Sequence, residues 1–457
     1  TVDDNDAVGT DAVSIQFQWT ILSESSFSWI DKVENENYNA RHECSFVQAG
    51  DKFYLMGGRE SSQTVDIYDY TSNTWSSLNN SAPFELNHFQ ATEYQGLIWI
   101  IGAFKTNNYP SELPAEYIWI FNPASNKWIQ GPQIPSNRQR GSTGLSVYND
   151  KFYISGGNTI GHNGGYVAWF DEYDPATGIW TPLEDAPRAR DHFHSAIVGG
   201  KLYLAGGRLS GGIGGAFKPV IPEVDVYDFA TSTWSTLPDN LPTPRAGAST
   251  VLFNNKLLVI GGEVETENVY GVITSDALEI TEAYDFEFST WSRISDLNHK
   301  RHGTQAIVSG NGVFTLAGSP NNGAGNQKNM EYFGIDAPVG EPSVASNISV
   351  PSPVQLNGNV PYEIPVTISG GNTGVFVTSI ELGGPDMDEF NIVSGNLTNT
   401  LLKANSIHNI VVEYIGVDGG KTAYVVINHG DAGQEIIVLE ASYFAVHINA
   451  GGPEVLE

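Results

Sequence analysis

Basic residues and cysteine are both scarce in this sequence. Its 457 residues include 22 lysines and arginines against 52 aspartates and glutamates, which gives a formal net charge of −30. A surface of that sign repels nucleic acids and anionic lipids, so we expect neither as a partner. Apart from a calcium ion held weakly by such a surface, we expect no cofactor.

The single cysteine, Cys44, excludes an intrachain disulfide. Stability must then come from the burial of apolar side chains, which a chain of this length permits. No run of about 18 apolar residues is present, which excludes a transmembrane helix. The first residues, Thr1–Asp6, lack the basic and apolar regions of a signal peptide. We expect an extracellular or cell-surface protein whose signal peptide has been removed, and its oligomeric state stays open.

What the sequence does contain is a repeat. Six segments share one order: a short apolar strand, a glycine pair or a glycine with a small residue, a variable loop, and an aromatic residue followed in most segments by aspartate. In the third segment these parts are Lys151–Gly157 and Tyr173-Asp174. Repeated tryptophans lie 46 to 57 residues apart, at Trp29, Trp75, Trp128, Trp180, Trp234 and Trp291. This composition predicts a series of small antiparallel sheets.

A period near 50 residues is typical of kelch repeats, in which each repeat is one four-stranded blade. Residues 15–335 resemble the kelch family, and the resemblance implies a six-bladed β-propeller over residues 1–335. The sixth segment, which ends near Phe333, has no tryptophan after it, whereas Trp29 precedes the first glycine pair. We therefore expect the N-terminal strand to complete the last blade and close the ring, which removes open sheet edges.

Beyond residue 335 the pattern changes. A proline-rich linker leads into residues 336–445, where short alternating strands such as Val375–Ile380 predict a β-sandwich. The run from Asn372 to Tyr443 resembles immunoglobulin-like accessory domains of bacterial surface proteins. Residues 446–457 resemble the opening strand of a malectin-like carbohydrate-binding domain over Ile448–Val455, and Leu456-Glu457 resembles a cloning junction. The expected fold class is all-β, a six-bladed propeller followed by an immunoglobulin-like sandwich.

The kelch family includes copper-radical oxidases similar to galactose oxidase, which need a cysteine cross-linked to a tyrosine, a second tyrosine and two histidines. Cys44 and the segment Phe193-His194-Ser195 resemble parts of that site. However, Phe193 stands where the axial tyrosine is needed, and Asn87-His88-Phe89 supplies no tyrosine either. A phenyl ring has no oxygen to bind copper. We therefore expect no copper-radical chemistry, with Cys44 as a small buried side chain.

Several histidines follow the first residue of a blade. His42, His88 and His302 come from blades one, two and six, which are neighbours around a closed ring, and His192 and His194 share one face of a predicted strand. Imidazoles that converge from neighbouring strands could hold zinc, copper or iron. The alternative, which we favour, is that they form hydrogen bonds between blades, so we predict no metal site.

The blade-start position is rich in arginine. It holds Arg41, Asn87, Arg140, Arg190, Arg245 and Arg301, so half of the ten arginines occupy one equivalent place. In kelch proteins this place lies at the mouth of the central channel. A guanidinium group binds carboxylate or sulfate through two parallel hydrogen bonds. We expect these six residues to bind ligand, unless acidic neighbours already pair with them.

These observations predict a non-enzymatic extracellular binding protein that recognises a glycan, in particular an anionic one, at the propeller mouth. Two alternatives stay open. One is a sugar-active kelch enzyme of the oxidase or sialic-acid mutarotase type, and the other is a protein-interaction scaffold that binds acidic peptides. Glycans and peptides both present carboxylates, and a fold by itself does not assign a function.

Overall fold

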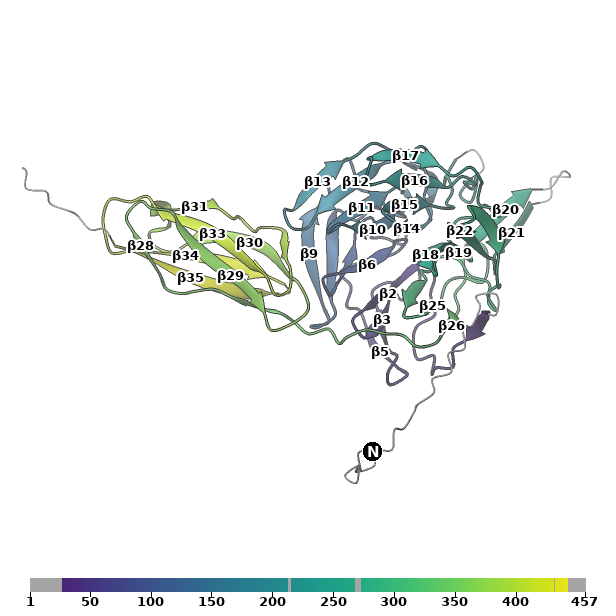
Figure 1. Ribbon diagram of the computed structural model, residues 1–457, viewed down its shortest axis with the longest axis horizontal. Helices are drawn as coiled ribbons and strands as arrows, with labels where there is room; N and C mark the ends of the chain where they lie inside the picture. Colours follow the sequence, from purple (N-terminus) through teal and green to yellow (C-terminus); the bar gives the residue numbers. More distant parts are fainter. Residues whose placement is uncertain (1–26, 213–214, 268–272, 431, 443–457) are drawn as a thin grey trace, which may run out of the picture.

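A computed structural model describes residues 27–212, 215–267, 273–430 and 432–442. Within these residues the regular structure is all β apart from two short 3₁₀ turns, η2 (Gly161–Asn163) and η3 (Met387–Glu389), which confirms the predicted fold class. A ring of four-stranded sheets lies beside an elongated pair of sheets (Figure 1). No helix in this described part is long and apolar enough to cross a membrane.

Six antiparallel four-stranded sheets form the blades of the propeller in the described residues. Blade one consists of β2 (Cys44–Ala49), β3 (Lys52–Gly57), β4 (Val65–Asp69) and β5 (Thr74–Leu78). Blade two consists of β6 (Ala91–Tyr94), β7 (Leu97–Ile100), β8 (Tyr117–Asn122) and β9 (Lys127–Gln133). Blade three consists of β10 (Gly144–Tyr148), β11 (Lys151–Ser155), β12 (Phe170–Asp174) and β13 (Ile179–Pro182). The innermost strands contact one another in cyclic order, so the ring is closed.

Blades four to six follow the same order, except that blade five carries an additional hairpin. Blade four consists of β14 (Ser195–Val198), β15 (Lys201–Leu204), β16 (Asp225–Asp228) and β17 (Thr233–Thr236). Blade five consists of β18 (Ser249–Phe253), β19 (Lys256–Ile260), β22 (Thr281–Asp285) and β23 (Thr290–Arg293), with the hairpin of β20 (Glu263–Glu267) and β21 (Ile273–Ala277). Blade six consists of β24 (Ile307–Ser309), β25 (Gly312–Thr315), β26 (Glu331–Gly334) and β1 (Trp29–Asp31).

The N-terminal strand β1 completes blade six by antiparallel pairing with β26. Trp29 lies opposite Phe333, as Trp75 lies opposite Tyr68 in blade one. The same aromatic–tryptophan pair recurs in every blade between the third and fourth strands. The indole Nε1 of Trp29 also donates to Thr281 Oγ1 of blade five at 2.9 Å, so β1 joins two blades. This repeated pair explains the period of the tryptophans.

The glycine pairs allow neighbouring blades to approach. Gly57 and Gly58 have φ values of 66° and 115°, a region that favours glycine. A Cβ at Gly57 would lie 2.5 Å from the carbonyl oxygen of Leu86 in the next blade. Any other residue there would push blades one and two apart.

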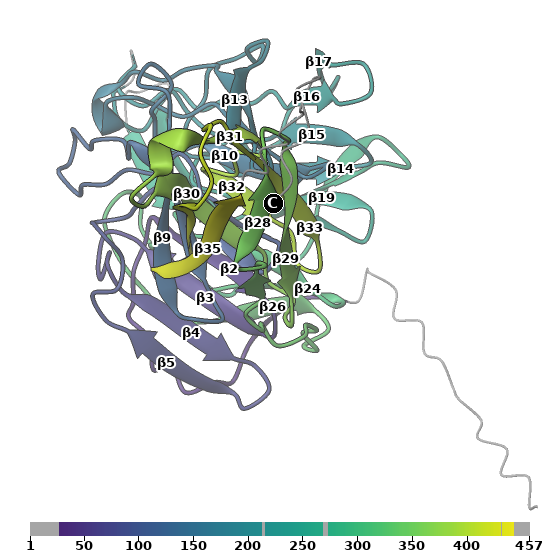
Figure 2. The same ribbon diagram turned by 90° about the vertical axis from the view of Figure 1, so that its left-hand side faces the viewer.

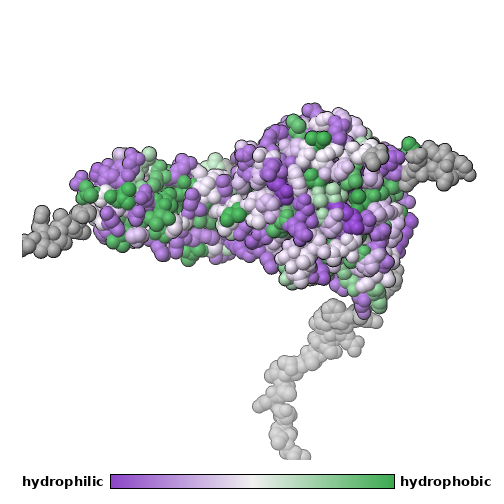
Figure 3. Space-filling view, turned by 90° about the horizontal axis from the view of Figure 1, so that it is seen from above, coloured by the Kyte–Doolittle hydropathy of each residue, from purple (hydrophilic) through white to green (hydrophobic). Residues whose placement is uncertain are grey.

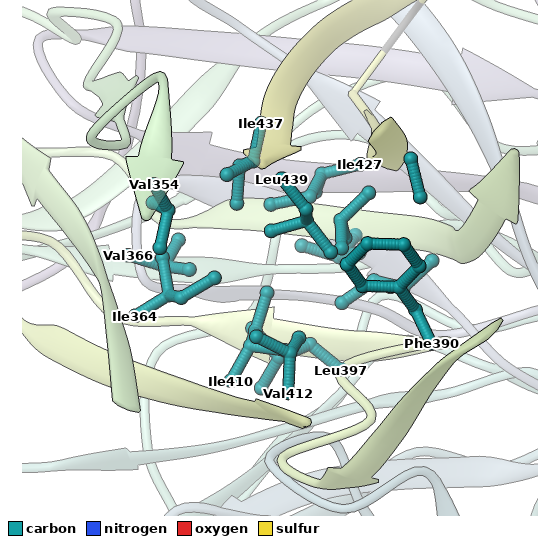
Figure 4. Close-up of a cluster of buried hydrophobic side chains, with 14 of the residues drawn as sticks. Val354, Ile364, Val366, Phe390, Leu397, Ile410, Val412, Ile427, Ile437 and Leu439 are labelled. Carbon is teal, nitrogen blue, oxygen red and sulfur yellow. The ribbon is translucent and has the colours of Figure 1, made fainter. Parts of the chain in front are cut away.

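The sandwich has a four-stranded and a five-stranded sheet. The first contains β27 (Asn347–Ser349), β29 (Tyr362–Ser369), β33 (Ile407–Tyr414) and β31 (Phe390–Ser394); the second contains β28 (Val354–Asn357), β35 (Gly433–Ser442), β34 (Lys421–His429), β30 (Val375–Gly383) and β32 (Thr400–Leu402). Apolar side chains from both sheets fill the space between them (Figure 4). The segment compared with a malectin-like strand, 446–457, lies outside the described residues.

The sandwich packs directly against blades two and three, and Figure 2, seen from the sandwich end, shows its strands in front of the propeller. Phe376 and Leu401, both buried, join the apolar cluster around Trp99, whose ring centroid lies 5.8 Å from that of Phe376. The backbone N–H of Gly374 donates to Gln95 O at 2.7 Å, and that of Leu401 donates to Pro175 O at 2.6 Å. The two domains therefore share a core instead of being joined by the linker alone.

Candidate functional site at the propeller mouth

A ring of residues with left-handed backbone surrounds the central channel, one from each blade. Their φ values lie between 50° and 65°, and they are Glu43, His88, Ser142, His192, Gly247 and Gly303. Backbone hydrogen bonds link neighbours in this ring, for example from His88 N to Glu43 O at 2.9 Å and from Gly247 N to His192 O at 2.7 Å. Left-handed backbone disfavours every residue with a Cβ by about 1–2 kcal/mol. Histidine and glutamate at three of these positions therefore indicate a role beyond local geometry.

The blade-start arginines lie just outside this ring and are fully enclosed. Each is at most 2% exposed and forms an ion pair with a carboxylate on the third strand of its own blade. The pairs are Arg41–Asp66, Arg140–Asp171, Arg190–Asp225, Arg245–Glu282 and Arg301–Glu331. Other guanidinium nitrogens donate to backbone carbonyls, as Arg190 Nη1 does to Leu204 O at 2.9 Å. Among the guanidinium nitrogens of these five described arginines, only Nε of Arg190 and of Arg301 lacks a partner, so the structure favours the alternative that acidic neighbours pair with these arginines, and their ligand binding stays an untested prediction.

The alignment of Asn87 with the blade-start arginines is wrong by one residue. The carbonyls of four blade-start arginines, all but Arg140, accept from the second residue of the glycine pair in the preceding blade, as from Gly157 N to Arg190 O at 2.8 Å. In blade two the matching acceptor is Leu86, which receives Gly58 N at 2.7 Å. Asn87 instead matches His42 and His302, and His88 matches Glu43. Blade two therefore has leucine in the arginine position.

A cavity of about 580 Å³ opens at one end of the channel. Its walls come largely from the loops between the second and third strands of the blades, which are the variable loops of the repeat. It is lined by His42, Glu43, Arg59, Glu60, Asn107, Tyr109, His162, Phe217, Asn322, Gly323 and Ala324. The rings of Tyr109 and Phe217 thus line the same cavity as charged and amide side chains such as those of Arg59, Glu60 and Asn107.

Three histidines converge at the inner end of this cavity. His88 and His192 belong to the left-handed ring, and His162 lies in η2. The three rings meet edge to face, with centroids 4.9 to 5.2 Å apart. One ring nitrogen from each lies within 4.8 Å of the other two. All three side chains are buried, which separates them from bulk water.

Each of these histidines has an oxygen acceptor at Nδ1. His88 Nδ1 lies 2.6 Å from Asn87 Oδ1, and His192 Nδ1 lies 2.5 Å from Asp191 Oδ1. His162 Nδ1 lies 3.1 Å from Glu112 Oε1. An oxygen acceptor at Nδ1 fixes the tautomer that leaves Nε2 unprotonated.

Burial sets the charge of the histidine cluster. It lowers the pKa of His88 well below its usual range, and it lowers the pKa of His162 to about 4. Burial opposes ionisation of Glu112 as well, but hydrogen bonds and charges from His162 and Arg59 outweigh it and lower the pKa of Glu112 to about 2. At neutral pH His88 and His162 are therefore neutral imidazoles, and His162 lies in front of an ionised Glu112 carboxylate.

The other predicted histidines surround the cluster without joining it. His42 Nδ1 contacts Glu60 Oε2 at 3.0 Å. His302 Nε2 lies 3.5 Å from Glu43 Oε1 and 3.4 Å from Glu263 Oε2. Burial opposes the charging of His302, but these two carboxylates outweigh it and raise its pKa. His302 therefore stays protonated more readily than a free histidine, and it lies between the carboxylates of Glu43 and Glu263.

His192 and His194 do not share the face of a strand, because both precede β14 and His192 has left-handed backbone. His194 instead borders a small cavity beneath the cluster, together with Glu43, Cys44, Phe89 and Phe193. The thiol of Cys44 is buried there, 3.7 Å from Thr304 Oγ1, and burial raises its pKa to about 11. A thiol in that state is a poor nucleophile.

Several residues of the site were not found from the sequence. Arg59, Glu112 and His162 all lie in loops whose length differs from blade to blade, so the repeat gives no alignment for them. Arg208 and Glu263 directly follow glycine pairs and form a buried ion pair. Their places after the glycines of blades four and five are the signal that could have identified them.

Comparisons with known proteins agree with this geometry. A family model described as Attractin/LZTR1 beta-propeller matches residues 11–262, more than half of the chain, and a Kelch motif model matches residues 244–298. The chain therefore belongs to this family of kelch propellers.

Its curated relatives include Kelch-like protein terF of Aspergillus terreus, which is 25% identical over 66% of this chain and 65% of its own length. Human Kelch-like protein 23 is 22% identical over 65% of this chain and 49% of its own length. The chain thus spans less than two thirds of either relative. The solved structure of YjhT covers 65% of this chain and 95% of its own, with a TM-score of 0.55 at 16% identity, which shows the fold alone.

Proposed function

We propose that the propeller binds the hydroxyl-rich end of a glycan in the mouth cavity. The observation that carries the proposal is the pairing of two aromatic side chains, Tyr109 and Phe217, with charged and amide groups in one cavity of about 580 Å³. Small-molecule sites fall in this size range and combine apolar walls with a few oriented polar groups. An aromatic face suits the C–H face of a sugar ring, while Arg59, Glu60 and Asn107 suit its hydroxyls.

The charges of the cavity favour a neutral glycan end over a strongly anionic one. Arg59 is paired with Glu112, and the cavity also carries Glu43 and Glu60. Because the blade-start arginines are enclosed, they add no free cation to this wall. We further propose an extracellular location, with the sandwich as a rigid spacer that holds the propeller away from a surface.

A glycan array with the full chain, followed by calorimetric titration of the best ligand, tests this proposal. Tyr109→Ala and Phe217→Ala should each weaken binding about tenfold, since each removes one stacking surface. Tyr362→Ala is the matched control, because Tyr362 is 46% exposed on the sandwich against 57% for Tyr109 on the propeller. Equal affinity of all three variants would place the ligand elsewhere.

Membership of the kelch family also favours a second candidate, a protein-interaction scaffold whose mouth holds an acidic peptide. The carboxylates of Glu43 and Glu60 oppose an acidic segment, so such a peptide should bind more tightly to the double variant Glu43→Gln/Glu60→Gln. If acidic peptides compete with the selected glycan for the original protein, the scaffold function is the better one.

A further inference from the structure

The histidine cluster has hydrogen-bonding capacity that the fold leaves unused. Among the described residues, neither Nε2 of His88 nor Nε2 of His192 has a hydrogen-bond partner, although both atoms are buried. Buried polar atoms in native proteins are nearly always satisfied, because burying them without a partner costs about 1–3 kcal/mol each. Two such atoms in one cluster call for a shared partner, and the nearest carboxylate oxygen, Glu43 Oε2, lies 3.4 Å from His88 Nε2 without forming a hydrogen bond to it.

The arrangement of Nδ1 partners identifies the kind of occupant. Metal-binding histidines almost always donate the second ring N–H to a carboxylate or carbonyl oxygen, which orients the ring and makes the other nitrogen more basic. His88, His162 and His192 each have such an oxygen, from Asn87, Glu112 and Asp191 respectively. These oxygens come from three different loops, so the same pairing of a histidine Nδ1 with an oxygen occurs three times in one cluster.

We propose that His88, His162 and His192 bind one divalent first-row transition-metal ion such as zinc. Their ligand atoms lie within 4.8 Å of one another. In a tetrahedral site with zinc–nitrogen bonds of about 2.0–2.1 Å, the nitrogens are about 3.3 Å apart, which small ring movements can reach. Three nitrogen donors select a transition metal and not calcium, which takes oxygen ligands.

The fourth position of this site is open toward the ligand cavity. Glu43 Oε2 lies 3.4 Å from His88 Nε2 and borders both the mouth cavity and the smaller cavity below it. His162 also lines the mouth cavity. Three protein nitrogens with one accessible position are typical of metal sites that bind an exchangeable ligand, whereas structural zinc sites are closed by four protein ligands. The metal would thus lie where a hydroxyl or carboxylate of a bound molecule arrives.

The metal site does not depend on glycan binding. Metal titration of the tag-free full chain tests the metal site. After chelator treatment and dialysis, cobalt(II) should bind at one equivalent per chain, with the intense visible bands of a four- or five-coordinate ion, and zinc should displace it. His162→Gln and His192→Gln should weaken cobalt binding more than about 100-fold. Asp191→Asn, which keeps the shape of the acceptor at His192 Nδ1 and of its bonds to Ser210 but removes its charge, should weaken it by about 10–100-fold.

His42→Gln is the matched control, since His42 lines the same mouth but lies outside the cluster. It should retain the stoichiometry and affinity of the original protein. The melting temperature of each variant, measured in chelator, separates lost cobalt binding from lost folding, and a small decrease is expected for His162→Gln because His162 is buried and bonded to Glu112. Weak, octahedral-type bands, or equal affinity of the His162 and His42 variants, would overturn the metal site. Glycan binding that persists in chelator would leave the proposed function standing on its own.

Discussion

The propeller and the sandwich are both all-β, but they bury different kinds of side chain. In the described part of the sandwich, the buried polar side chains are those of Thr373 and Thr400, and its core is formed by aliphatic residues, Phe390 and Tyr414. The propeller buries five arginines at its blade starts together with their carboxylates, and a group of histidines at its centre. The surface differs less, because both domains expose scattered apolar side chains among polar ones (Figure 3).

The difference follows from the way each domain brings its strands together. Two facing sheets need only apolar side chains between them, since their backbone groups pair within each sheet. Six blades that meet around a channel leave backbone carbonyls at the blade starts, and each buried guanidinium donates to several of them. The polar interior of the propeller therefore contributes to its stability and also lies beneath the mouth cavity.

The largest effect should come from opening the ring. Trp29→Ala removes a side chain that is 3% exposed, packs 5.6 Å from Phe333 and is bonded to blade five. A substitution of this kind costs about 3–5 kcal/mol. Phe390→Ala in the sandwich should cost a similar amount. Calorimetry should show Trp29→Ala lowering the propeller transition and Phe390→Ala the sandwich transition, and a Trp29→Ala protein with an unchanged melting temperature would mean that β1 does not close the ring.

A slightly smaller effect is expected from one blade-start ion pair. Asp225 is fully buried and accepts from Arg190, Arg188 and Thr236. Asp225→Ala leaves the Arg190 guanidinium enclosed without its counter-charge, which costs about 3–5 kcal/mol. Urea unfolding measures this loss. Asp296→Ala is the control, since its pair with Arg293 is exposed and should contribute about 0–1 kcal/mol; equal losses would show that the buried pairs are not structural.

Acid should distinguish the two domains by a smaller amount. Burial lowers the pKa of His194 to about 4, whereas an unfolded histidine titrates near 6.5. Between these values the unfolded chain binds more protons, so propeller stability should fall as the pH falls from about 6.5 to 4, by up to about 1.4 kcal/mol per pH unit. His302 acts in the opposite sense, because the stability from its raised pKa is lost as the pH rises through it.

Melting curves between pH 7 and 5 in chelator measure this slope. His194→Gln should remove its share of this slope from the propeller transition and leave the share of His88 and His162, while the sandwich transition should move less. Below that range Glu112 adds a further loss, since its pKa of about 2 is below the unfolded value and its stabilisation disappears as the pH falls through 4.5 toward 2. A propeller transition that does not respond to acid between pH 7 and 5 would contradict a buried neutral His194.

The fold could be predicted from the sequence because each blade repeats the same contacts. The period of the tryptophans reflects the aromatic–tryptophan pair between the third and fourth strands, and β1 supplies the last one. The carboxylate partners of the arginines could also have been predicted from the sequence. Each lies two residues before the aromatic residue that pairs with the tryptophan, as Asp171 does before Tyr173. Blade two has Leu86 and Trp119 in these two places, so it lacks both members of the pair together.

The site itself could be predicted only in part. His88 and His192 follow the blade starts and were candidates, but His162 belongs to a loop with no equivalent in the other blades. Its position depends on Glu112 of the preceding blade, which no spacing along the chain reveals. The contact between the sandwich and the propeller could not be predicted either. In the sequence, Phe376 and Leu401 fit an alternating strand pattern and resemble core residues of the sandwich, whereas in the structure they pack against the propeller.

That docking allows the smallest prediction, which asks whether charge or apolar contact joins the two domains. Lys403 Nζ of the sandwich lies 2.6 Å from Asp150 Oδ2 of blade three, but the two side chains are 41% and 59% exposed. An exposed pair of this kind contributes about 0–1 kcal/mol, and salt screens it further.

Leu401→Ala, two residues from Lys403 and only 2% exposed, should cost about 2–5 kcal/mol. In calorimetry Lys403→Ala should leave the coupling of the two transitions unchanged, while Leu401→Ala should separate them. If Lys403→Ala separated the transitions and 0.5 M salt did the same to the original protein, the interface would depend on charge, and the sandwich would resemble the propeller more than its core indicates.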